Sequence, residues 1–246
     1  MGKRIKVQRR GRGTPVFQAA KSGKISQVKY PESIIEEEVK GTIKEILHES
    51  GRNAPLAYIE LSNNQNYYTI APEGTYVNQE INVGKNASLK VGNVLPLGKI
   101  PEGTMVCNIE IRPGDGGRIA RSGGSFATII AQNPKKTVLK LPSKRNIAIN
   151  NNSRATIGII SCGGRLEKPY LKAGEAWHSA KTSNKVYPIA HGVKMYAATH
   201  PHGGGRHRRP GKSTTVGRRL PPGAKVGLIA ARSSGRGGKR VRRVET

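Results

Sequence analysis

The positive charge of this chain is concentrated toward its two ends. The 246 residues include 43 Lys and Arg against 15 Asp and Glu, which gives a formal net charge of +28. Residues 1–30 hold nine bases and no acid, and residues 191–246 hold fourteen bases and one acid. Residues 31–110 instead hold six bases and eleven acids, whereas residues 111–190 hold fourteen bases and three acids. So much like charge weakens a compact fold unless a polyanion neutralises it, so a nucleic acid or an anionic membrane is the expected partner.

The two ends contain too little apolar material to fold alone. Residues 191–246 include eleven Gly and four Pro, and Tyr196 is their only aromatic residue. Residues 1–30 likewise have few large apolar side chains. Burial of such segments cannot offset their conformational entropy. We therefore expect both ends to become ordered only on a partner.

Membrane and secretory classes are not indicated. The sequence has no run of about 18 apolar residues, and no apolar segment follows the basic N-terminus. The two cysteines, Cys107 and Cys162, lie far apart in sequence. This spacing predicts buried, reduced thiols in a cytoplasmic protein.

The middle of the chain is typical of short strands. In residues 104–111, alternation would place Met105, Cys107, Ile109 and Ile111 on one face. Residues 57–61 and 67–70 flank a hairpin-like connection at residues 62–66. Further β-branched runs occupy residues 125–131, 137–141, 146–149 and 155–160. Many short strands separated by turns predict β-barrels.

One segment allows two interpretations. Ile35, Val39, Ile43, Ile46 and Leu47 have helical spacing, and Glu36–Glu38 would suit a first helical turn. Gly41 interrupts that pattern, and the turn-forming residues 49–53 that follow fit a hairpin. We favour a strand.

Catalytic and metal-binding patterns are weak. His191, His200, His202 and His207 lie close in sequence, but no Cys pair accompanies them and no Asp or Glu is near His200. These histidines are better explained as hydrogen-bond donors to phosphate or a base. The cluster Glu32, Glu36, Glu37 and Glu38 fits a solvated face or a contact with a basic protein. We expect no enzyme activity, no metal and no cofactor.

The basic ends combine cations with glycine. In residues 203–209, three Gly precede Arg206, His207, Arg208 and Arg209. Lys and Arg neutralise phosphates, and Gly lets the backbone approach them closely. Only 4% of residues are aromatic, so the composition favours folded RNA recognised by shape and backbone over single strands read by stacking.

Several strings resemble the universal large-subunit ribosomal protein two family. The most specific is Gly192-Val193-Lys194-Met195 followed by His200-Pro201-His202-Gly203-Gly204-Gly205. The archaeal form of the family is indicated by the strings at residues 8–13, 71–74, 113–117, 168–174 and 221–227. The likeness runs essentially from end to end. The residues before His200 lack the Asn and Asp usual there, which further weakens a catalytic interpretation.

The resemblance implies a mainly β fold with an OB-fold barrel followed by an SH3-like barrel, and extended basic N- and C-terminal arms. It implies an N-terminal arm at 1–35, the OB-fold barrel at 36–112, the SH3-like barrel at 113–190 and a Gly/Arg-rich extension at 191–246. It further implies a structural constituent of the large ribosomal subunit in the cytoplasm, bound to 23S-type rRNA. Expected partners are other ribosomal proteins and the small subunit across an intersubunit bridge, with roles in tRNA placement and near the peptidyl transferase region. No membrane or small-molecule substrate is expected.

The expected rRNA contacts lie in three groups. The N-terminal group is Lys3, Arg4, Arg9, Arg10 and Arg12. The second-barrel group is Arg112, Arg118, Arg121, Arg154 and Lys172. The C-terminal group is His200, His202, Gly203, Gly204, Gly205, Arg206, Arg208, Arg209, Lys212, Arg218, Arg219, Arg232, Arg236, Lys239 and Arg240. Two alternatives remain open: an enzyme in which His200 assists peptide-bond formation, and a free nucleic-acid chaperone with disordered arms.

Overall fold

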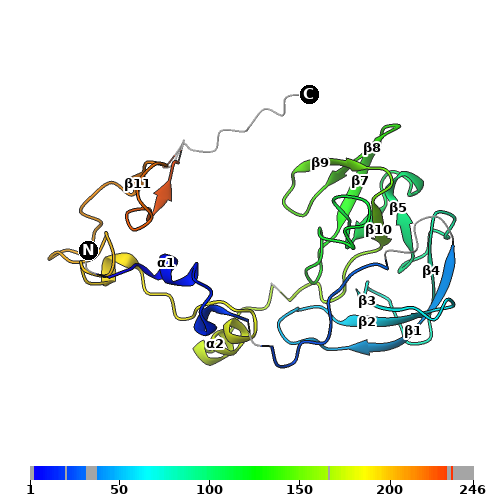
Figure 1. Ribbon diagram of the computed structural model, residues 1–246, viewed down its shortest axis with the longest axis horizontal. Helices are drawn as coiled ribbons and strands as arrows, with labels where there is room; N and C mark the ends of the chain where they lie inside the picture. The colour runs from blue at the N-terminus through cyan, green and yellow to red at the C-terminus, as the bar shows by residue number, and fades with distance from the viewer. Residues whose placement is uncertain (1–2, 20, 32–37, 166, 232–233, 235–246) are drawn as a thin grey trace. The chain divides into compact units, whose positions relative to one another are not determined.

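A computed structural model describes residues 3–19, 21–31, 38–165, 167–231 and 234. The chain forms two compact units. The barrel unit comprises residues 20–183, and the end unit comprises residues 1–19 together with 184–246. Figure 1 shows the elements within each unit.

The barrel unit is built on one ten-stranded sheet with strand order β3-β2-β1-β4-β5-β10-β6-β7-β8-β9. Neighbours pair antiparallel except β4 and β5, which pair parallel. The strands are β1 (Val39–Leu47), β2 (Leu56–Leu61), β3 (Asn66–Ile70), β4 (Glu80–Val83), β5 (Val94–Pro96), β6 (Met105–Cys107), β7 (Ala127–Gln132), β8 (Lys136–Lys140), β9 (Asn146–Asn150) and β10 (Arg154–Ile157). The helix α2 (Ala173–Thr182) completes this unit.

Two main hydrophobic cores divide the sheet. The first packs residues of β1–β4 around Ile43, Ile59 and Ile81, and it includes Tyr30. The second packs residues of β5–β10, with Leu95 and Leu139 among them. In Figure 1 the blue and cyan strands β1–β3 and the green strands β7–β10 form two distinct groups. The fold class is therefore mainly β, consistent with the two expected barrels, whereas the domain boundaries at residues 35, 112 and 190 stay predictions.

The segment before β1 is anchored in the barrel unit. Val28 and Tyr30 are buried, and the Tyr30 hydroxyl lies 2.8 Å from the carbonyl oxygen of Asn108 and 2.6 Å from Thr156 Oγ1. Val28 and Tyr30 thus enter the core, whereas residues 21–27 before them are exposed. The acidic cluster lies outside the described residues except for Glu38, which is exposed and accepts a hydrogen bond from the side chain of Asn82.

Most strands expected from the sequence are confirmed. In the ambiguous segment, Val39–Leu47 form strand β1, which contains a bulge between Ile43 and Glu45, whereas Ile35 lies outside the described residues. The hairpin around residues 62–66 joins β2 to β3, and Asn64 takes a positive φ of 59° in its turn.

The alternation expected over residues 104–111 is wrong. Met105 and Ile111 are 44% and 45% exposed, whereas residues 106–110 are all buried. The strand ends at Cys107 because Asn108 takes a positive φ of 47°, which breaks the two-residue repeat. Buried thiols were expected at both cysteines; this is confirmed for Cys107 and wrong for Cys162, which is exposed in a turn with φ of 62°.

The end unit packs residues near the N-terminus against residues from the last quarter of the chain. Its elements are the helix α1 (Lys6–Arg10) and the short parallel strands β11 (Thr215–Val216) and β12 (Leu228–Ile229). Ile5 and Val226 are both buried. The backbone N–H of Lys3 donates to the carbonyl of Ala198, and Figure 1 shows α1 beside the yellow segment around residue 195. Within the described ranges, no helix is long or apolar enough to cross a bilayer.

Candidate nucleic-acid interface

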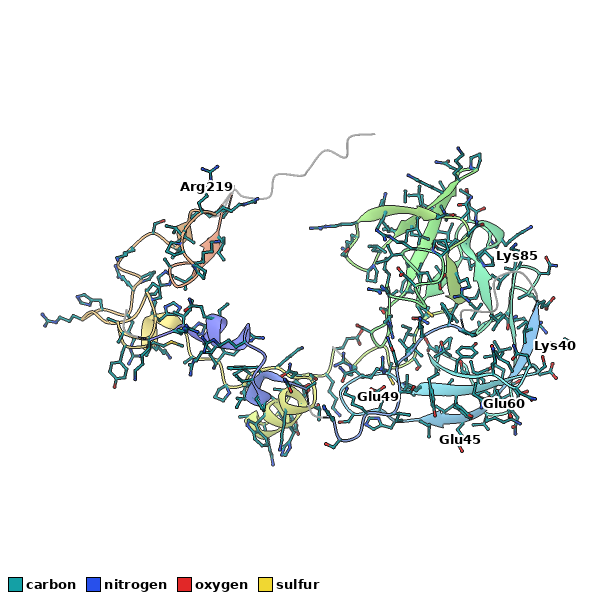
Figure 2. The ribbon with its side chains drawn as sticks, in the orientation of Figure 1. Lys40, Glu45, Glu49, Glu60, Lys85 and Arg219 are labelled. Atoms are coloured by element: carbon teal, nitrogen blue, oxygen red, sulfur yellow. The ribbon has the colours of Figure 1, made fainter. Side chains whose placement is uncertain are left out.

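The described part of the end unit contains cations without carboxylates. Residues 3–19 and 184–231 include fifteen Lys and Arg and no Asp or Glu. Residues 3–19 and 184–231 therefore supply no carboxylate as a counter-charge for these cations. Figure 2 shows one of them, Arg219, extending away from the ribbon. Such a surface attracts polyanions by its own field.

Ile5 anchors the N-terminal group of cations. Its side chain is buried, and its backbone N–H donates to Gln8 Oε1 at 3.1 Å, which closes the first turn of α1. The expected rRNA contacts around it are all exposed: Lys3, Arg4, Arg9, Arg10 and Arg12. One buried apolar residue thus fixes the backbone while the neighbouring charges face solvent.

The loop from Gly192 to Gly204 closes on itself. Gly192 packs directly on the His200 ring, since a Cβ added there would lie 2.1 Å from His200 Cε1. A Cβ at Gly203 would lie 2.4 Å from the Met195 carbonyl oxygen, and the Gly204 N–H donates to that same oxygen at 2.9 Å. These close approaches explain why glycine occupies the two positions.

His200 is held as a neutral hydrogen-bond donor. The backbone N–H of His202 donates to His200 Nδ1 at 3.0 Å, so the ring proton is assigned to Nε2. Burial, and then the nearby His202, lower the pKa of His200 below its ordinary value. One side of the ring lines an apolar cavity of about 170 Å³ together with Ile5, Met195 and Val226. The ring can donate to a phosphate or a base, but no carboxylate of the described end unit orients it for proton transfer.

The remaining C-terminal cations flank this loop. Gly204 and Gly205 take positive φ values of 78° and 81°, which direct the chain out of the loop. The predicted contacts that follow are exposed: Arg206, Arg208, Arg209, Lys212, Arg218 and Arg219. Arg232, Arg236, Lys239 and Arg240 lie outside the described residues.

A buried carboxylate supports the basic loop of the second barrel. Glu110 is fully buried and accepts hydrogen bonds from the backbone N–H groups of Gly116 and Arg154, each at 2.9 Å. This holds the turn at residues 113–117. Arg112 and Arg118, on either side of the turn, are both exposed. Lys172, which precedes α2, is exposed as well.

Arg154 differs from the other predicted contacts of the second barrel because it is buried and paired within the fold. The residue is only 4% exposed, its Nη2 lies 2.8 Å from Glu110 Oε1, and its Nη1 donates to the Pro31 carbonyl at 2.7 Å. The guanidinium also lies 5.3 Å from the centroid of the Tyr30 ring. All these partners are internal, so Arg154 stabilises the fold, and its role as an rRNA contact stays a prediction.

The burial of Arg121 is intermediate between that of the exposed Arg112 and Arg118 and that of the buried Arg154. Arg121 is half-buried and donates to the carbonyls of Gly117 at 2.8 Å and Val28 at 3.2 Å. Burial, and then the neighbouring Arg52, lower the pKa of its guanidinium. Its first role in the structure is to tie the basic loop to residues 21–31.

Further cations of the end unit were missed by sequence reasoning. They are Lys6, Lys185, Lys194 and Lys225, and each lies within the same acid-free stretches as the predicted contacts. The lack of any neighbouring Asp or Glu was the signal that could have identified them. Within the described residues, no group of three His, Cys, Asp or Glu is arranged to hold a metal ion.

Comparisons with known proteins agree on one family. Residues 90–226 match the family model described as Ribosomal Proteins L2, C-terminal domain. The chain is 51% identical over 241 residues to the large ribosomal subunit protein uL2 of Korarchaeum cryptofilum, with 98% of each chain covered. It is 50% identical over 244 residues to the uL2 of Pyrobaculum calidifontis, again with 98% of each covered. It is also 46% identical over 239 residues to that of Methanothermobacter thermautotrophicus, with 96% of this chain and 99% of the relative covered. The expected fold class, the basic loops and these full-length relatives show that the chain belongs to the ribosomal protein uL2 family.

Proposed function

We propose that this chain is a structural constituent of the large ribosomal subunit and that it binds 23S-type rRNA. The observation that carries the proposal is the described end unit, with fifteen Lys and Arg and no Asp or Glu. Binding a small substrate does not require so large an excess of positive charge. Closely packed RNA helices, in contrast, need cations between their phosphates.

The binding mechanism is electrostatic. The exposed side chains of Arg206, Arg208 and Arg209 make charge-assisted and bidentate contacts with phosphates as counterions leave the RNA. The glycines at 203–205 let the backbone approach the RNA closely. In the second barrel, buried Glu110 fixes the turn that separates Arg112 and Arg118, so these two cations bind from a rigid frame.

His200 acts by position in this proposal. It provides a neutral imidazole N–H from a loop that is packed against Gly192, and it has no carboxylate partner in the described end unit. We therefore assign peptide-bond chemistry to RNA and only a supporting role near the peptidyl transferase region to this loop. Subunit association, tRNA placement, neighbouring ribosomal proteins and a bridge to the small subunit belong to the same proposal, as does residence on cytoplasmic ribosomes.

Co-sedimentation with large subunits tests the proposal. The tagged full-length chain, expressed in cells, is expected to sediment stoichiometrically with the large subunit in moderate salt. A free nucleic-acid chaperone would instead dissociate and remain at the top of the gradient. That second outcome would overturn the structural role while leaving RNA binding intact.

A further inference from the structure

Trp177 is the only tryptophan of the chain, and it is exposed. It lies on α2, whose only buried residue is Ala180, and 44% of Trp177 is accessible to solvent. Burial of an indole ring is among the largest apolar gains that a side chain can make. Only 4% of the residues are aromatic, yet this ring is left exposed to solvent. The exposed ring offers a surface suited to a planar partner.

Neighbouring side chains hold the ring in place. Lys181, one helical turn further along, places its Nζ 5.3 Å from the ring centroid. The ring of His178 meets the indole edge-on, with the centroids 4.9 Å apart. The indole is thus a preset platform, and ordering it on a partner costs little further entropy.

The side of α2 that carries Trp177 has no acid of this helix on it. At 100° per residue, Ala173, Gly174 and Lys181 share this side of α2. A Cβ added at Gly174 would meet no atom within 4 Å, so space remains beside the ring. Glu175, the only acid of α2, lies about 200° around the helix from Trp177 and accepts the backbone N–H of Leu171 at 3.2 Å.

We propose that Trp177 is a stacking site for one unpaired base of large-subunit rRNA, with Lys181 contacting the phosphate of that nucleotide. The inference rests on the proposed function and adds one specific contact to its electrostatic mechanism. An aromatic ring beside a cation, without a carboxylate, matches the π-face and the phosphate of a nucleotide. A basic protein segment would find no counter-charge on this face.

The single tryptophan makes the test direct. Emission from the full-length chain is followed during titration with a large-subunit rRNA fragment, while filter binding measures complex formation independently. We expect the emission to fall by more than half on binding. We also expect the acrylamide quenching constant to fall severalfold, because a stacked base shields the ring.

Variants separate stacking from general charge. Trp177→Leu is expected to weaken RNA binding about 5- to 140-fold, the range for one stacked base, whereas Trp177→Phe retains a ring and loses less than about threefold. Lys181→Gln is expected to reduce the salt slope by about 0.7–0.9, the value of one phosphate contact. Tyr76→Leu is the matched control, since Tyr76 is another exposed aromatic residue, and it is expected to leave affinity unchanged. Circular dichroism confirms that each variant is folded.

Three outcomes would overturn the inference in different ways. RNA bound in the filter assay without any change in emission or acrylamide access would exclude stacking and leave the proposed function standing. Shielding that arises only in assembled subunits, and not with RNA alone, would identify a neighbouring protein as the occupant. A wild-type chain that does not bind the RNA would refute the proposed function together with the stacking site.

Discussion

Replacement of Arg154 by Met is expected to destabilise the barrel unit and to leave RNA affinity nearly unchanged. The substitution removes the 2.8 Å contact with Glu110 Oε1 and the hydrogen bond to the Pro31 carbonyl. It leaves the fully buried Glu110 carboxylate without its cation. Breaking a buried pair in this way costs about 3–5 kcal/mol, and the orphaned carbonyl adds about 1 kcal/mol. Against a total stability of about 5–15 kcal/mol, this loss is severe.

Urea unfolding of the full chain measures the loss, and RNA titration at a temperature where the variant is folded measures affinity. The double variant Glu110→Gln with Arg154→Met removes the buried charge, so it is expected to recover at least half of the lost stability. Arg112→Gln is the matched control, since Arg112 is exposed on the same barrel. It is expected to change stability by less than about 0.5 kcal/mol and to reduce the salt slope by about 0.7–0.9.

The opposite pattern would refute this reasoning. If Arg154→Met kept the stability of the wild type and reduced the salt slope as Arg112→Gln does, then Arg154 would be an rRNA contact after all. The internal ion pair would then contribute nothing measurable to the fold.

Three further predictions address the loop, the thiols and the ends. Burial lowers the pKa of His200, so its imidazole is already neutral at pH 7. Subunits reconstituted with His200→Gln should therefore keep the wild-type pH dependence of single-turnover peptide transfer. If the variant instead lost the reaction by orders of magnitude, together with a titration near pH 6–7, a positioning role would be contradicted. Iodoacetamide should label Cys162 in the native chain, but Cys107, whose pKa burial raises to about 12, only after unfolding; native labelling of Cys107 would contradict its burial. Backbone amides of the end unit should exchange fast in the free protein and slowly in the subunit; strong protection without RNA would show that the contact region around Ile5 folds unaided.

The strands were predictable from local sequence because β-branched runs and turn residues lie next to each other in the chain. Residues 66–70 and 136–140 form strands for this reason. The failure at residues 104–111 has a local cause that the pattern does not encode, namely the positive φ of Asn108. The helix α2 was missed because it buries only Ala180 and so has no repeated apolar stripe.

The positive charge of the candidate site was predictable from the sequence, but the ion pairs buried within the fold were not. The exposed cations of the end unit follow from the lack of Asp and Glu in residues 3–19 and 184–231, which needs no knowledge of the fold. Whether Arg154 faces solvent depends on Glu110, which lies 44 residues away in sequence. Such a partner is set by the pairing of β10 with β6 and not by any local motif.

The salt dependence of binding to a large-subunit rRNA fragment tests the central claim most directly. With on the order of ten phosphate contacts, log K should fall by about 7–9 per log unit of salt. Changing Arg206, Arg208 and Arg209 together to Gln should make this slope shallower by about 2–3. The same change at Lys135, Lys136 and Lys140, which are exposed on the barrel unit, should leave the slope nearly unaltered. A wild-type slope near zero, or equal changes in the two triple variants, would contradict an interface centred on the end unit.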